Sequence, residues 1–153
     1  MRVARFFKVS LNDEIKEYYD DIKLPRRATS GSAGYDFYLP YDLVIKPNEG
    51  ATIKTGVRAK IRKGFVLLIF PRSSLGTKYK LMLDNTIGVI DSDYYFALNE
   101  GHIIIQLTNH SNEVLELKKG ERFVQGLFLK YGKTYDDKIK DKRTGGLGST
   151  GKK

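Results

Sequence analysis

The sequence predicts an all-β protein with a separate C-terminal arm. Short apolar segments with the two-residue period of strands recur over residues 51–131, and turn residues separate them. Residues 133–153, in contrast, carry three apolar side chains, four glycines and a net charge of +4, from seven Lys and Arg against three Asp. The 153 residues suit one domain, and many short strands at close spacing favour a β-sandwich or barrel over residues 1–132.

The composition excludes several kinds of chemistry. Because the chain has no Cys and two His, it cannot hold a disulfide, a thiolate zinc site, an iron–sulfur cluster or a cysteine nucleophile. The longest apolar run, Phe65–Phe70, is too short to span a bilayer, and the N-terminus lacks the apolar stretch of a signal peptide. We therefore expect a cytoplasmic protein. Its net charge of +9 favours anionic partners: nucleic acid, anionic membrane or phosphorylated small molecules.

The first element expected along the chain is a short helix over residues 10–22. Ser10 is a suitable N-cap, and four apolar or aromatic side chains recur near one face: Leu11, Ile15, Tyr18 and Ile22. Two alternatives compete with the helix: extended structure, which the adjacent Tyr18 and Tyr19 favour, and a loop.

Strands are expected from residue 51 onward. Alternation over Ala51–Ile61 predicts one half-buried strand with Ile53, Val57 and Ile61 on the same side. The continuous apolar run Phe65–Phe70, ended by Pro71, suits a strand buried on both faces. Residues 103–105 and 114–115 read as two short strands joined by a turn, and residues 123–131 alternate again.

Two polar stretches lie beside predicted strands. Ser32–Asp36 reads as a turn followed by a strand. Arg72, Ser73 and Ser74 follow Pro71, and an Arg with two hydroxyls at a strand end makes a good oxyanion cradle. The alternative for this second stretch is an exposed turn with a solvated Arg.

A third stretch, Asn85–Tyr94, looks like a β-hairpin with an apolar centre and polar ends. Asp91 comes directly after Gly88–Ile90, so it would sit at the edge of a packed strand, where partial burial can tune a carboxylate as a general base. The alternative is a hairpin whose Asp residues serve only the turn.

Two further stretches lie near the C-terminus. Arg143–Gly151 has the glycines and hydroxyls that suit a phosphate-binding loop, here on a mobile arm. It fails the P-loop pattern because Lys153 stands in place of Ser or Thr and no strand precedes it. Gly120–Gln125 reads, taken alone, as a structural turn before a strand.

Together and in this order, the five stretches resemble the trimeric deoxyuridine triphosphatases, or dUTPases, over residues 25–151. The resemblance implies a jelly-roll-like β-barrel over residues 1–132 that forms a homotrimer. Residues 133–153 would be a flexible arm that closes over a neighbouring subunit's active site. The implied reaction is the Mg²⁺-dependent hydrolysis of dUTP to dUMP and pyrophosphate, which limits uracil incorporation into DNA and supplies dUMP for thymidylate synthesis.

The resemblance also implies a role for each matching residue. Asp91 would activate the water that attacks the α-phosphorus, Gln125 would hydrogen-bond near that water, and Asp36 would hold Mg²⁺ through water. The implied substrate-binding residues are Arg72, Ser73 and Ser74 for the phosphates, Asn85, Gly88 and Ile90 for uracil, Tyr94 for the deoxyribose, and Arg143, Leu147, Gly148, Ser149 and Thr150 on the arm.

Three positions depart from the family pattern. Many relatives have Gly in place of Ser74, and many have an aromatic residue in place of Leu147, which stacks on uracil. Tyr94 is followed by residues 95–101 instead of a shorter link.

Three other functions compete with this one. A dCTP deaminase shares the fold but would need a catalytic Glu near the base. A single-strand nucleic-acid binder would use the +9 charge and the ten Tyr, but it gives Asp91 and the arm no role. The third is a dUTPase fold used as a protein-binding regulator, which some phage relatives resemble. The enzyme residues would be present in that case too, and a phage-derived chain would have a regulatory protein partner. We expect dUTP and further copies of the chain as partners, with no stable nucleic-acid partner and no membrane.

Overall fold

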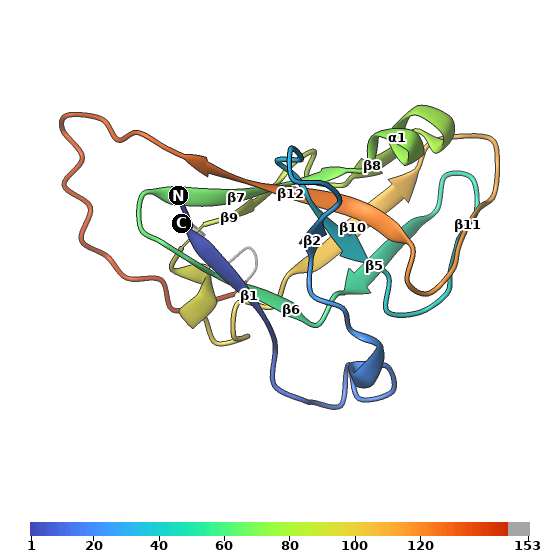
Figure 1. The fold of residues 1–153 in the computed structure, drawn as a ribbon, viewed down its shortest axis with the longest axis horizontal. Coiled ribbons are helices and arrows are strands. Elements are labelled where there is room, and N and C mark those ends of the chain that lie inside the picture. Colours follow the sequence, from blue (N-terminus) through green and yellow to red (C-terminus); the bar gives the residue numbers. More distant parts are fainter. Residues whose placement is uncertain (147–153) are drawn as a thin grey trace.

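The computed structural model describes residues 1–146, and strands make up nearly all of its regular structure (Figure 1). One α-helix, α1 (Ser73–Tyr79), and two 3₁₀ turns, η1 (Tyr19–Asp21) and η2 (Tyr94–Phe96), complete it. The strands in chain order are β1 (Ala4–Lys8), β2 (Arg26–Arg27), β3 (Tyr35–Tyr38), β4 (Leu43–Ile45), β5 (Gly50–Lys54), β6 (Val57–Ile61), β7 (Phe65–Pro71), β8 (Leu81–Leu83), β9 (Gly88–Ile90), β10 (Ile104–Asn109), β11 (Leu115–Leu117) and β12 (Arg122–Lys130).

The strands form four sheets. The largest has the order β2-β3-β12-β7-β9, a second has the order β5-β10-β8, and β1-β6 and β4-β11 make two further pairs. Every pairing is antiparallel. The all-β prediction is therefore confirmed, but none of the sheets within residues 1–146 closes on itself as a barrel.

The core lies between these sheets. Leu67 and Ile69 of β7 and Ile53 of β5 are fully buried, as are Leu107 of β10 and Leu115 of β11. Because their strands belong to three different sheets, burial of these side chains is what holds the layers together.

The strand expected over Ala51–Ile61 is two strands. Its alternation is right, since Ile53, Val57 and Ile61 are all buried. The direction changes at Gly56, which has a φ of 71° and a position where a Cβ would overlap Cδ1 of Ile22. As a result, β5 pairs with β10 whereas β6 pairs with β1.

The helix expected over residues 10–22 is wrong. The segment is a run of turns that ends in η1. Two tyrosine hydroxyls draw the chain toward distant backbone: Tyr18 donates to the Lys54 carbonyl at 2.8 Å and Tyr19 to that of Val9 at 2.9 Å. Ile15 and Ile22 are nevertheless buried, so these apolar positions face the core although the segment is not a helix.

Strand β7 is covered on one face instead of two. Phe65 and alternate residues after it are buried, whereas Val66, Leu68 and Phe70 are half-buried on the outer face of the five-stranded sheet. Among residues 1–146, no helix is both long enough and apolar enough to cross a membrane.

Candidate active site

The first group of predicted site residues lies at one end of the five-stranded sheet. Gln125 of β12 is directly opposite Asp36 of β3 and Phe70 of β7, so the three side chains project from the same face. The Asp36 carboxylate is 13% exposed and accepts a hydrogen bond from Nη1 of Arg122 at 3.1 Å. The charge of Arg122 therefore compensates that of a largely buried Asp.

Gly34 packs closely against the side chain of Gln125. A Cβ at Gly34 would lie 2.6 Å from Oε1 of Gln125, well inside van der Waals contact. Sequence reasoning did not give a role to Gly34 or Arg122. The only signal for Gly34 was its place inside the Ser32–Asp36 stretch.

Arg72, Ser73 and Ser74 lie beside this group, where β7 ends and α1 begins. Arg72 is the residue before α1, and its backbone N–H donates to the Phe123 carbonyl at 3.2 Å. Both serines are exposed in the first helical turn. The helix forms because Leu75 packs into the core directly after them.

The second group surrounds residues 85–94, which are not a hairpin. β8 pairs with β10, whereas β9 pairs with β7, so the segment crosses from one sheet to another. The crossing turn holds Asn85, whose carbonyl accepts from the Ile87 N–H at 2.7 Å, and Thr86, whose φ is 67°.

A cavity of about 320 Å³ opens beside this crossing. Gly88 lets β9 pack closely against β7 beside the cavity, because a Cβ at this position would lie 3.0 Å from Cβ of Ile69. The lining is apolar with a few amides, namely Ile69, Leu83, Asn85, Gly88, Val89, Ile90, Ile104, Ile105 and Gln106. An apolar cavity with few polar groups suits a flat heterocyclic base.

Asp91 follows β9 and is held by the arm of its own chain. Nη2 of Arg143 lies 2.8 Å from Oδ2 of Asp91, and Nε of Arg143 lies 2.9 Å from Oδ1 of Asp93. The guanidinium also stands 5.6 Å from the centre of the Tyr94 ring. The Arg143 side chain is 10% exposed, so the two carboxylates and the ring largely enclose it.

Tyr94 is buried and its hydroxyl is fully bonded. It donates to the His102 carbonyl at 2.6 Å and accepts from Nδ2 of Asn99 at 2.9 Å. Burial raises the pKa of the phenol, while the Asn99 hydrogen bond and the charge of Arg143 oppose this rise. The phenol therefore stays protonated and acts as a donor.

One chain does not bring the two groups together. Ile90, just before Asp91, is opposite Leu67, whereas Gln125 is opposite Phe70 near the other end of the same strand. With strand spacings of about 4.8 Å and a rise of about 3.3 Å per residue, Asp91 and Gln125 are separated by roughly 15 Å. Leu147, Gly148, Ser149 and Thr150 lie outside the described residues.

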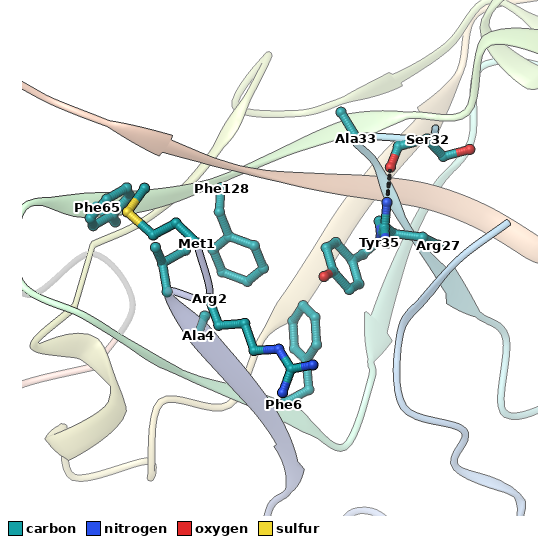
Figure 2. A pocket seen from close by; sticks show the side chains of 11 residues that line it. Met1, Arg2, Ala4, Phe6, Arg27, Ser32, Ala33, Tyr35, Phe65 and Phe128 are labelled. Atoms are coloured by element: carbon teal, nitrogen blue, oxygen red, sulfur yellow. Dashed lines mark hydrogen bonds between the residues drawn. The ribbon is translucent and has the colours of Figure 1, made fainter. Parts of the chain in front are cut away.

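A larger cavity, of about 580 Å³, lies beside β1 and contains none of the predicted site residues (Figure 2). Four aromatic rings line it, those of Phe6, Tyr35, Phe65 and Phe128. Arg27 at its rim is already engaged, since its Nη1 donates to the carbonyls of Ser30 and Ser32. Size alone therefore does not identify the active site.

These features define a class of nucleotide hydrolase. An exposed carboxylate, arginines and an apolar base-sized cavity occur on a β scaffold that has no Cys. A family model described as dUTPase matches residues 20–151. The chain belongs to the dUTPase family.

Curated relatives agree with this assignment. The chain is 42% identical over 133 residues to the deoxyuridine 5'-triphosphate nucleotidohydrolase of Lactococcus lactis subsp. lactis, covering 85% of this chain and 89% of that protein. It is 40% identical over 142 residues to the fowlpox virus protein of the same name, covering 88% and 93%. The chain is an enzyme that hydrolyses dUTP in nucleotide metabolism.

Solved structures share the fold. The dUTPase from Streptococcus mutans superimposes with a TM-score of 0.71 at 38% identity, covering 84% of this chain and 97% of that chain. The dUTPase from phage phi11 of Staphylococcus aureus superimposes with a TM-score of 0.69 at 20% identity, covering 92% and 97%. At that identity the phage enzyme supports the fold alone.

Proposed function

We propose that the enzyme releases dUMP and pyrophosphate when a water activated by Asp91 attacks the α-phosphorus, in a site that neighbouring subunits of a homotrimer share. The observation that carries this proposal is the separation of Asp91 from Gln125 within one chain. General-base catalysis requires contact distance or one intervening water, so a single chain cannot complete the site.

The outer face of the five-stranded sheet supports an interface between subunits. Val89 is 56% exposed and Leu129 is 45% exposed, and the half-buried Val66, Leu68 and Phe70 lie on the same face. Asp36 and Gln125 stand at the end of this apolar surface. A second copy that covers the surface would therefore bring its own residues next to them.

The reaction chemistry matches the side chains available. Phosphoryl transfer needs an aligned water, neutralised charge and accurate positioning, and no covalent intermediate. Asp91 is the exposed carboxylate for the proton, whereas buried His102 is already an acceptor for the Gly56 N–H at 2.8 Å. The attacking water adds to the α-phosphorus, its proton passes to Asp91, and pyrophosphate leaves.

Binding roles divide between the two groups. Asn85 and the backbone of Gly88 and Ile90 would hydrogen-bond the uracil edge in the cavity of about 320 Å³. The ring of Tyr94 would lie under the deoxyribose. Arg72 and the two serines at the start of α1 would hold phosphates, with Ser74 occupying more room than the Gly of many relatives.

The residues present fit Mg²⁺ bound mainly by the substrate. Within residues 1–146, no group of three or more His, Asp or Glu side chains could hold a metal ion. Mg²⁺ commonly keeps several waters and uses one carboxylate together with substrate phosphates, and Asp36 is the carboxylate beside Gln125. When bound, Mg²⁺ neutralises charge on the triphosphate.

We also propose that the enzyme acts in the cytoplasm.

A pyrophosphate-release assay with four nucleotides tests the proposal. We expect Mg²⁺-dependent turnover of dUTP and poor turnover of dTTP, dCTP and UTP, because a tight site leaves clashes or unpaired polar groups with each of these. Activity that persists in EDTA would contradict the metal role, and equal turnover of UTP and dUTP would contradict the sugar role of Tyr94.

A further inference from the structure

The link formed by residues 95–101, which follows Tyr94 on the way to β10, is held in place at two points. The family-like pattern would have a shorter link here. Both ends of the longer one make specific polar contacts, so its extra residues are organised around Tyr94.

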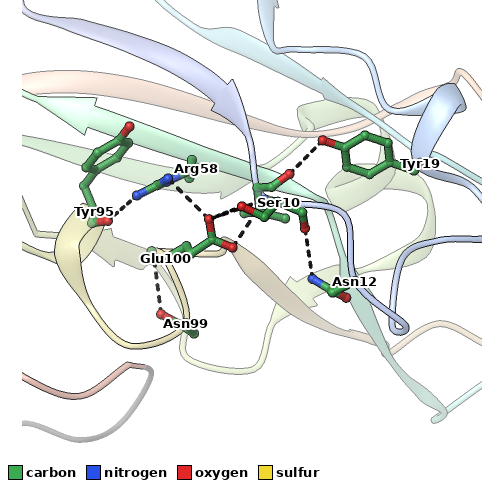
Figure 3. A network of polar contacts seen from close by, with 9 residues as sticks. Ser10, Asn12, Tyr19, Arg58, Tyr95, Asn99 and Glu100 are labelled. Atoms are coloured by element: carbon green, nitrogen blue, oxygen red, sulfur yellow. Dashed lines mark hydrogen bonds and ion pairs between the residues drawn. The ribbon is translucent and has the colours of Figure 1, made fainter.

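The outer contact joins the link to the N-terminal segment. Glu100 accepts hydrogen bonds from the backbone N–H of Ser10 at 3.2 Å and from its hydroxyl at 2.7 Å, and lies 3.5 Å from Nη1 of Arg58. Arg58 in turn donates to the Tyr95 carbonyl at 2.6 Å and stacks 3.6 Å from the centre of the Tyr95 ring (Figure 3). These contacts fix the path of the link.

The inner contact is made by Asn99. Its Nδ2 donates to the Tyr94 hydroxyl at 2.9 Å, and its Oδ1 accepts from the Gly101 N–H at 3.1 Å. The backbone of Asn99 also accepts from the His102 N–H at 3.1 Å. The hydrogen bond to Oδ1 thus orients the side-chain amide, and Nδ2 holds the phenol.

The link turns sharply at Gly101, which brings it back against the backbone of Tyr94. Gly101 has a φ of 70°, and a Cβ there would lie 2.6 Å from the carbonyl oxygen of Tyr94. Because only Gly can pass so close, the backbone of Tyr94 is clamped by the return of its own link.

We propose that Asn99 is a positioning residue for sugar selection, which fixes the Tyr94 ring so that it cannot move away from a ribose 2′-hydroxyl. This inference rests on the proposed role of Tyr94 under the sugar. Two hydrogen bonds from different directions meet at the Tyr94 oxygen, one from Asn99 and one to the His102 carbonyl. With His102 alone, the ring could pivot about that single bond and admit the larger sugar.

Substitution of Asn99 separates positioning from a purely structural role. We expect Asn99→Ala to lower the ratio of kcat/KM for dUTP to that for UTP by about 3- to 10-fold, the effect of losing one hydrogen bond. A structural role would lower both values equally and leave the ratio unchanged. If Asn99→Ala does not fold, Asn99→Leu keeps a side chain of similar size and removes every hydrogen bond to the phenol from this position.

A double-substitution cycle tests whether Asn99 acts through the phenol. In a Tyr94→Phe background, adding Asn99→Ala should leave the dUTP/UTP ratio unchanged, because the oxygen that Asn99 holds is gone. Ser10→Ala is the matched control: it removes a hydrogen bond to the same link at 2.7 Å and should not alter the ratio.

The outcomes distinguish this inference from the proposed function. A relaxed ratio in Tyr94→Ala with an unchanged ratio in the Asn99 variants overturns the role of Asn99 alone. An unchanged ratio in Tyr94→Ala overturns the sugar role of Tyr94, and the Asn99 inference with it. A further loss of selectivity when Asn99→Ala is added to Tyr94→Phe shows that Asn99 does not act through the phenol.

Discussion

Asp91 and Asp93 have almost the same surroundings but different proposed roles. Both contact the guanidinium of Arg143, at 2.8 and 2.9 Å, and their side chains are 59% and 57% exposed. A comparison between them therefore separates proton transfer from the ion pair with the arm.

We expect Asp91→Asn to lower kcat by about 10²- to 10⁴-fold with little change in dUTP affinity, because the amide keeps the shape but cannot accept a proton. Saturating pyrophosphate-release assays measure kcat. Asp93→Asn is the matched control and should retain most of the rate. If both variants lost the same activity, the ion pair with Arg143 would be the important feature and Asp91 would not be the base.

Gly34 allows a prediction about Gln125 without changing Gln125. We expect Gly34→Ala to fold normally, because the clash at 2.6 Å is with the flexible end of a side chain. The displaced amide should lower kcat by on the order of 10²-fold, as expected for misplacement near 1 Å. In Gly31→Ala, where a Cβ meets nothing within 4 Å, the rate and the melting temperature should both be unchanged.

The break between β5 and β6 depends on Gly56. We expect Gly56→Ala to lower the free energy of unfolding by about 1–3 kcal/mol more than Gly64→Ala does. Both substitutions strain a backbone with positive φ, but only an Ala at position 56 is also overpacked, against Ile22. Both glycines have positive φ, 71° and 88°, but a Cβ at Gly64 meets nothing within 4 Å. Urea denaturation measures both, and equal losses would show that the contact with Ile22 is unimportant.

His102 makes the same region sensitive to pH. Burial lowers its pKa in the folded state, which favours the neutral ring that accepts from the Gly56 N–H. As pH falls below about 6.5, the unfolded chain takes up a proton first, so this contribution to stability is full above that pH and is lost below it. Melting temperatures from pH 7 to 5 should fall less in His102→Gln than in the parent protein; exposed His110→Gln is the control.

Local pattern predicted burial better than it predicted pairing. Ile53, Val57 and Ile61 are buried as their alternation indicated, yet the strand that contains them is split, because Gly56 avoids Ile22 from a distant segment. Residues 85–94 look like a hairpin locally, but β8 and β9 find partners in different sheets. Such choices depend on contacts that no short window contains.

The candidate site shows the same limit. The resemblance named Asp36, Gln125, Asp91 and Tyr94, but it could not show that Gln125 lies roughly 15 Å from Asp91 in one chain and that Asp36, one strand further away, lies roughly 20 Å from it. Asn99 was not singled out as a site residue, because an Asn in a link carries no pattern until the phenol beside it is seen.

Mixing defective chains tests the shared site. Asp91→Asn and Arg72→Ala should each be nearly inactive as pure trimers, and co-refolding the two should restore activity, because some sites then combine an intact Asp91 with an intact Arg72. If both residues served one site from one chain, mixing would restore nothing. Light scattering should give three chains per particle, and an active monomer would contradict the proposal.

The arm needs its own mixing experiment. Arg143 contacts Asp91 of its own chain in the structure, whereas the resemblance implies that the arm serves a neighbour. The Arg143 side chain is only 10% exposed in this ion pair, which leaves little room for a phosphate, so we expect the guanidinium to be released from Asp91 and Asp93 and to act on another chain's substrate. Asp91→Asn mixed with a chain truncated before Arg143 should then regain activity; no recovery would show that the arm acts on its own chain.

Because Asp91 and Gln125 lie far apart in one chain, the catalytic activity of each chain should depend on the protein concentration. A chain that has just left the ribosome holds two incomplete half-sites and should turn over nothing until it meets other copies. Specific activity should therefore fall on dilution toward the dissociation constant of the trimer, although every chain remains folded. The expression level of the protein would then determine both the amount of enzyme in the cell and the fraction of it that is catalytically active.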